Sequence, residues 1–108
     1  MAKVEVLRNG VAVGVLEKEA EDKYLFVYHD EYIDNEDSYP ISVTLPKQKE
    51  PFVSDYLFSF FSNLLSEGNM KKLQCRTLKI DEDDEFTRLM KTATHDTIGS
   101  VVVREIEN

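Results

Sequence analysis

Residues 3–16, KVEVLRNGVAVGVL, decide how the first half of this chain folds. Valines alternate with charged or small residues on both sides of Asn9 and Gly10. A tight two-residue turn between strands needs positive φ at both central positions, and Asn-Gly adopts such angles with little strain. We therefore predict an antiparallel hairpin that turns at Asn9 and Gly10.

The next apolar run, KYLFVYH, predicts a third strand after the hairpin. Alternation places Tyr24, Phe26 and Tyr28 on one face and Leu25 and Val27 on the other. Both faces are apolar, which is typical of a strand with structure on both sides. We expect this strand to be central in its sheet.

Polar residues 29–40 follow and predict a loop, which leads into the segment PISVTLP at 40–46. Ile41, Val43 and Leu45 alternate with polar residues there, and a proline stands at each end. Because proline cannot donate a hydrogen bond to a neighbouring strand, the segment predicts a short strand at a sheet edge.

The second half of the chain favours helices. Ser54 is a suitable N-cap for a first helix that ends at Ser66, Glu67 and Gly68, with Gly68 as a left-handed C-terminal residue. Its apolar residues recur at three- and four-residue spacing, and they are Tyr56, Leu57, Phe60, Phe61, Leu64 and Leu65. Such periodic residues usually face inward, so Phe60, Phe61, Leu64 and Leu65 are predicted core residues.

Two more helices and a strand complete the predicted fold. Asn69 would cap a short helix that carries Met70, Leu73 and Thr77. The segment DEDDEFTRLMKTA predicts a further helix, with its acids at the start, its bases late and an apolar stripe of Phe86, Leu89, Met90 and Ala93. A final strand follows Gly99. Residues 1–108 thus predict one α+β domain, a mostly antiparallel sheet covered on one side by about three helices.

Composition limits the classes of function. The net charge is −8, and the 13 Lys and Arg are scattered among 21 Asp and Glu. Because nucleic-acid affinity depends on neutralising phosphates, we expect no direct nucleic-acid binding. An acidic surface would suit a basic partner or simply maintain solubility. A lone cysteine, Cys75, and the absence of a long apolar run or signal segment predict a cytoplasmic protein that does not enter a membrane.

Catalytic and ligand-binding motifs are missing from the sequence. The glycines at 10, 14, 68 and 99 are too far apart for a phosphate-binding loop. His29, His95 and Cys75 are too few and too dispersed for a zinc site, and the DEDDE run lacks the ligand alternation of a calcium loop. His95, Asp96 and Ser100 lack the geometry of a triad and predict a turn instead. We predict no catalytic residue, no metal and no cofactor.

Five segments in chain order resemble the N-terminal subdomain of HipA-type toxin kinases. They are GVL (14–16), YLFVYHDEYI (24–33), PISVTLP (40–46), LFSFFSNLLSEG (57–68) and THDTIGSVVV (94–103). The family pattern includes Pro-Leu-Ser-x-Ser-Leu-Pro and, further on, Phe-Phe-x-x-Leu-Leu-Pro-Glu-Gly. The chain departs from this pattern at Ser66, Thr94 and Ser100, where the family usually has Pro, Gly and Ala.

The resemblance implies a partner. A HipA-type kinase continues well beyond this subdomain, whereas this sequence stops at Asn108. That combination resembles the HipS family, the small antitoxins of tripartite HipBST toxin–antitoxin systems. It implies that the chain binds and neutralises a HipT/HipA-like serine/threonine kinase, with a HipB-like DNA-binding protein in a ternary complex. The alternative is a structural subunit that completes or stabilises the kinase or its repressor complex without inhibiting it.

The predicted contact with that kinase is the loop after the first helix. It consists of Ser66, Glu67, Gly68, Asn69 and Met70. A short loop between two helices can project into a partner's cleft with little reorganisation. The preceding Phe and Leu residues would position it as core.

Overall fold

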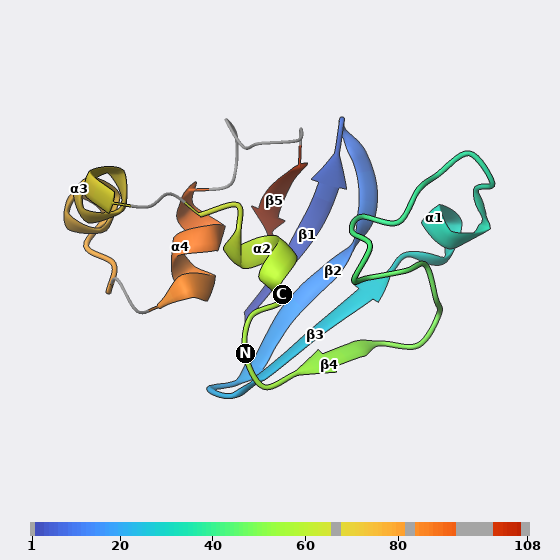
Figure 1. Ribbon diagram of the computed structural model, residues 1–108, viewed down its shortest axis with the longest axis horizontal. Helices are drawn as coiled ribbons and strands as arrows, with labels where there is room; N and C mark the ends of the chain where they lie inside the picture. The colour runs from blue at the N-terminus through green and yellow to red at the C-terminus, as the bar shows by residue number, and fades with distance from the viewer. Residues whose placement is uncertain (1, 66–67, 82–83, 93–100, 107–108) are drawn as a thin grey trace.

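A five-stranded antiparallel sheet organises the computed structural model, which describes residues 2–65, 68–81, 84–92 and 101–106 (Figure 1). The strands are β1 (Ala2–Arg8), β2 (Val11–Ala20), β3 (Lys23–Tyr28), β4 (Phe52–Ser54) and β5 (Val101–Glu105), in the spatial order β4-β3-β2-β1-β5. The helices of this part of the chain are α1 (Asp30–Asp34), α2 (Ser59–Ser62), α3 (Gly68–Leu78) and α4 (Glu85–Thr92). The α+β class predicted from the sequence is confirmed.

The predicted hairpin is confirmed. Asn9 and Gly10 have φ angles of 51° and 82°, as a turn between β1 and β2 requires. A second glycine, Gly14, is required by close packing between strands. A Cβ at this position would lie 2.3 Å from the backbone oxygen of Val27 in β3, so β2 and β3 could not keep their spacing with any larger residue.

Strand β3 lies inside the sheet, between β2 and β4. Tyr24, Phe26 and Tyr28 are buried and Leu25 and Val27 are half-buried, in agreement with the two apolar faces of its sequence. The central strand by position is β2, because it has two strands on each side.

The segment between β3 and β4 was predicted incorrectly in two places. The polar stretch 29–40 contains a short helix, α1. The predicted strand at 40–46 is a tight turn, in which Ser42 and Leu45 form an isolated bridge and the Ser42 and Thr44 hydroxyls lie 3.0 Å apart. Hydroxyl side chains that bond locally favour turns over ladders, which explains the difference. The actual edge strand is β4.

The first predicted helix is much shorter than expected. Ser54 ends β4 instead of capping a helix, because residues 52–54 pair with β3. Helix α2 contains only residues 59–62, and turns follow it. The apolar spacing was nevertheless informative, since Phe61 and Leu65 are buried and Phe60 and Leu64 pack against the core.

Helix α3 begins at Gly68, so this glycine does not end the preceding helix and Asn69 lies inside the helix. Leu73 and Thr77 lie on α3, as predicted, and both are exposed, Leu73 by 58%. Helix α4 forms as predicted, with Phe86 and Leu89 fully buried. Asp84 caps it by accepting hydrogen bonds from the Thr87 backbone N–H at 3.2 Å and the Thr87 hydroxyl at 2.7 Å.

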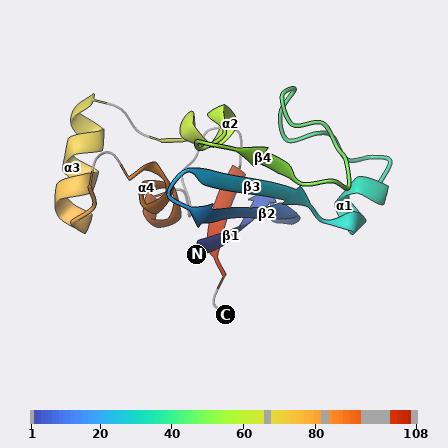
Figure 2. The ribbon, with the colours of Figure 1, turned by 90° about the horizontal axis from the view of Figure 1, so that it is seen from below.

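The core lies on one face of the sheet, as predicted. Figure 2 views the sheet nearly edge-on and shows α2 and the loop before β4 on that side. Phe61 belongs to this layer: it is fully buried, and its ring lies 5.5 Å from that of Phe26. The buried strand residues on this face are Val4, Val6, Leu16, Tyr24, Phe26, Tyr28, Val101 and Val103.

Candidate partner-binding surfaces

The predicted contact loop is only partly described. Ser66 and Glu67 lie outside the described residues, as do His95, Asp96 and Ser100. Gly68, Asn69 and Met70 form the first turn of α3. The loop therefore stays a prediction, with a described backbone for its last three residues.

Residues that could hold a metal are not gathered in the described part of the chain. No group of three or more His, Cys, Asp or Glu side chains lies together among those residues. Cys75 is buried in α3, as predicted for a small core thiol. No described helix is long and apolar enough to cross a membrane.

The face of the sheet opposite the core is unusually apolar. Strand register brings its side chains together, because Val15 pairs with Val27, Leu25 with Val53 and Leu7 with Val102. We call this surface the open face, and its residues are Lys3, Glu5, Leu7, Val15, Glu17, Leu25, Val27, Val53, Val102 and Arg104. A solvated face of an antiparallel sheet normally carries mainly polar residues, so six apolar side chains indicate a contact surface.

Charges on the open face balance one another. Glu5 lies 2.9 Å from the Arg104 guanidinium and 3.4 Å from the His29 ring. Lys3 and Glu17 are cross-strand neighbours. Two bases thus face two acids, although the whole chain has a net charge of −8. The open face is therefore close to neutral, which lowers the cost of covering it with an apolar surface.

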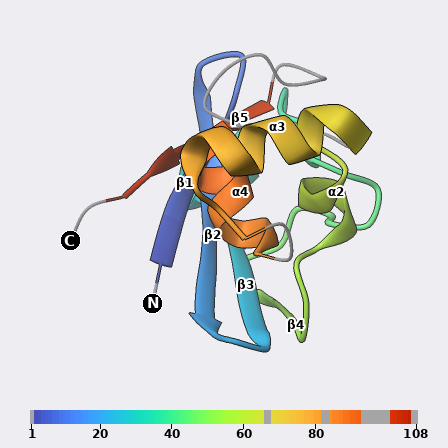
Figure 3. The same ribbon diagram turned by 90° about the vertical axis from the view of Figure 1, so that its left-hand side faces the viewer.

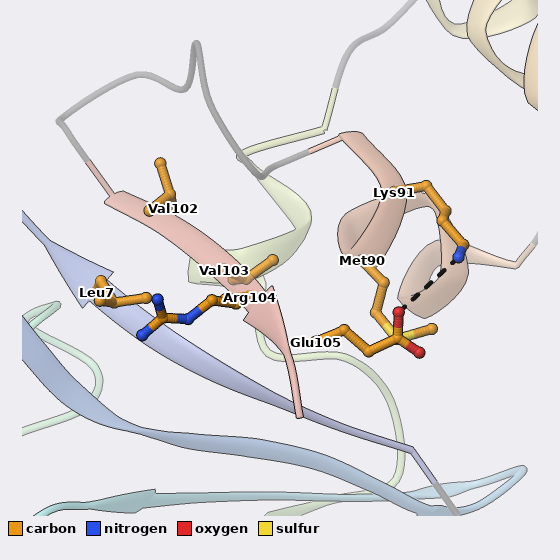
Figure 4. A pocket seen from close by; sticks show the side chains of 7 residues that line it. All are labelled: Leu7, Met90, Lys91, Val102, Val103, Arg104 and Glu105. Atoms are coloured by element: carbon orange, nitrogen blue, oxygen red, sulfur yellow. Dashed lines mark ion pairs between the residues drawn. The ribbon is translucent and has the colours of Figure 1, made fainter. Parts of the chain in front are cut away.

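A groove continues the open face around the β5 edge (Figure 4). Its volume is about 460 Å³, and its lining residues are Leu7, Met90, Lys91, Val102, Val103, Arg104 and Glu105. Lys91 and Glu105 lie 3.9 Å apart across it, joining α4 to β5. Leu7, Val102 and Arg104 belong to both surfaces, so the groove and the open face form one continuous area.

A hydrogen-bonded tyrosine holds the loop between β3 and β4 against the core. The Tyr28 hydroxyl donates to the Leu45 carbonyl and accepts from the Ile41 N–H at 2.9 Å. Burial raises the pKa of Tyr28, while the hydrogen bond from Ile41 acts in the opposite direction. The neutral phenol can donate to Leu45 and the phenolate cannot, so this contact requires the protonated form.

The fold and most of the sequence match a known protein family. The family model of the HipA N-terminal domain matches residues 4–104. The chain belongs to this family. The solved N-terminal domain of HipA toxin superposes on this family member with a TM-score of 0.72 and 28% identity, covering 100% of this chain and 95% of that one.

Two relatives show the domain in chains of different length. An uncharacterised protein of Haemophilus influenzae is 31% identical over 101 residues, which cover 94% of this chain and 90% of the relative. The putative kinase Y4mE of Sinorhizobium fredii is 28% identical over 81 residues, which cover 75% of this chain and 19% of the relative. The matched region is therefore about a fifth of that putative kinase.

The open face was not predicted as a site from the sequence, although two of its apolar residues were identified. Leu25 and Val27 were predicted to face away from Tyr24, Phe26 and Tyr28. Only the strand register shows that Val15, Val53 and Val102 join them.

Proposed function

We propose that this HipA N-terminal-family domain is a non-catalytic antitoxin subunit that binds a HipT/HipA-like serine/threonine kinase in trans and neutralises it. The observation that carries the proposal is the apolar open face, with its continuous groove, on a domain that also occurs as a fifth of a putative kinase.

A domain that is part of a longer chain packs one of its surfaces against the rest of that chain. Such contacts between domains resemble the interfaces of separate proteins. On this domain the neutral, apolar open face is suited to that packing, because covering it removes apolar surface from water without stranding an unpaired charge. The same face on a separate chain would restore the contact between two proteins.

The loop Ser66, Glu67, Gly68, Asn69 and Met70 remains the proposed contact for inhibition, while the open face supplies the docking area. A HipB-like DNA-binding protein is the proposed third member of the complex. The alternative function, a structural subunit that stabilises the kinase or its repressor complex without inhibiting it, needs the same docking area. Kinase activity measured with and without the domain separates the two.

The test uses one substitution on the open face and a matched control. Val53→Asp places a charge on the open face at a position that is 61% exposed. Val11→Asp makes the same change at a position that is 54% exposed and paired with Arg8 near the hairpin turn. We expect Val53→Asp to weaken binding to a HipT/HipA-like kinase at least tenfold by calorimetry and to restore the phosphorylation activity of that kinase.

Val11→Asp should bind and inhibit like the unmodified protein, and both variants should keep the original melting temperature within a few degrees. Equal binding by all three proteins would show that the open face is not the docking area. Failure of the unmodified protein to bind the kinase at all would refute the proposed function.

A further inference from the structure

Positive charge in this chain is concentrated on one helix. Lys71, Lys72, Arg76 and Lys79 lie between residues 68 and 80, a stretch that contains no Asp or Glu. These are four of the chain's 13 basic residues, so the remainder has nine bases and 21 acids and a net charge of −12. The segment of α3 thus has the opposite sign to the rest of the protein.

Three of these four basic side chains are exposed to solvent, and Lys71 is half-buried. Lys72 and Arg76 are exposed and are four residues apart, which places them on the same side of the helix. Lys79, directly after the helix, is also exposed and has a φ angle of 57°. No ion pair within 4.0 Å joins Lys72, Arg76 or Lys79 to an acid of the described residues.

Exposed leucines accompany these charges. Leu73 is 58% exposed and Leu78 is 46% exposed. Among the α3 side chains that the structure describes, Cys75 is the buried one, and the helix packs against α4. Figure 3 shows α3 in front of α4, and Figure 1 shows it at one end of the molecule, away from β3 and β4. A whole side of α3 is therefore accessible.

We propose that α3 is a docking helix that binds an acidic surface of the kinase through Lys72, Arg76 and Lys79, with Leu73 in apolar contact beside them. This inference rests on the proposed function. The acidic character of the partner surface follows from charge complementarity. A basic helix on an otherwise acidic protein attracts carboxylates and repels basic groups. The position of the helix fits the predicted contact loop, since Gly68, Asn69 and Met70 are its first turn.

Nucleic acid is the other ligand that a basic helix could attract. Here the acidic run 81–85 follows α3 directly, and the whole chain carries a net charge of −8. Both would repel a phosphate backbone, whose binding requires neutralisation over several contacts. Exposed leucines have no counterpart in phosphate recognition, whereas they suit a protein surface.

The experiment compares three charge reversals of equal size. Lys72→Glu and Arg76→Glu change α3, and Lys49→Glu changes an exposed residue of the loop before β4. We expect each α3 variant to bind the kinase about tenfold more weakly than the Lys49→Glu control. Most of the loss should be in the association rate, and it should shrink as salt rises from about 0.05 to 0.5 M, because salt screens exposed charges.

If the α3 variants and the Lys49→Glu control bound the kinase with equal affinity, the inference about α3 would be wrong. The proposed function would still stand in that case, provided that the unmodified protein binds the kinase. A fluorescent DNA duplex serves as a second probe. If the α3 variants lost duplex binding and retained kinase binding, the helix would be a nucleic-acid contact and the inference would be wrong. Circular dichroism checks that both variants stay folded, and Lys72→Gln tests loss of charge without reversal.

Discussion

Tyr28 shows how a single side chain ties a loop to a sheet. Its hydroxyl accepts a hydrogen bond from the Ile41 N–H and donates one to the Leu45 carbonyl. Its ring stacks on that of Tyr32, with 5.8 Å between the ring centroids. Tyr32 in turn donates to the Tyr39 carbonyl at 2.6 Å. The turn at Ser42–Leu45 is thus held by phenol groups, where the sequence had predicted a strand ladder.

Tyr28→Phe should therefore destabilise the protein by about 1–3 kcal/mol, because two buried backbone groups lose their partner. The effect should depend on pH. Burial raises the pKa of Tyr28 above its ordinary value of 10.0, so the unfolded chain loses this proton first and stability falls as pH rises through 10. Urea unfolding should show a full difference at pH 7 that narrows above pH 10. A constant difference would contradict the role assigned to the phenol proton.

Phe61 is the core residue in a comparison that distinguishes core residues from contact residues. It is fully buried, and its ring lies 5.2 Å from Phe60 and 5.5 Å from Phe26. Phe61→Ala should lower the free energy of unfolding by about 3–5 kcal/mol through lost contacts and a cavity.

Asn69→Ala with Met70→Ala supplies the comparison for Phe61. That variant should keep the fold and weaken kinase binding, as expected of the predicted contact loop. Thermal unfolding and calorimetric binding measure the two effects separately. If both variants lost stability equally, the division between core and contact residues would be wrong.

At the scale of elements, local signals predicted the type of structure better than its extent. The hairpin at Asn9-Gly10 was predictable because turn chemistry alone specifies it. Residues 52–54 could not be assigned in the same way, since their strand exists only because β3 offers pairing partners at Tyr24 and Phe26. The three- and four-residue spacing of apolar residues correctly predicted that Phe61 and Leu65 are core residues. They reach the core from a short helix and the turns after it, however, and not from one long helix.

Helix α4 depends on the cap that Asp84 supplies. Asp84→Ala removes both hydrogen bonds to Thr87 and should cost about 1 kcal/mol. Asp84→Asn should recover most of this loss, because an amide oxygen also accepts a bond at the first turn. Chemical unfolding measures both variants. Equal losses for alanine and asparagine would point to the charge of Asp84 instead of its hydrogen bonds.

On the scale of the whole molecule, the candidate surfaces were harder to predict than the fold. The open face is assembled from all five strands, so its apolar character appears only once the register aligns Val15, Val27, Val53 and Val102. The basic segment of α3 was readable in the sequence as four bases within nine residues. The prediction described the 13 bases as scattered along the chain, and it therefore missed this cluster. Its exposure, however, depends on α3 packing against α4, a tertiary property.

The two edges of the sheet have different consequences for an unbound copy of this chain. Edge strand β4 has three residues and follows Pro51, which makes it a poor template for another strand. Edge strand β5 has five residues and pairs on one side with β1. Among the described strands none pairs with its outer side, so the backbone donors and acceptors there could extend the sheet with a neighbouring molecule. Arg104 and Glu105 place charged side chains on this strand, and charge on an edge strand disfavours pairing with another copy. A partner seated in the adjoining groove would cover the same edge.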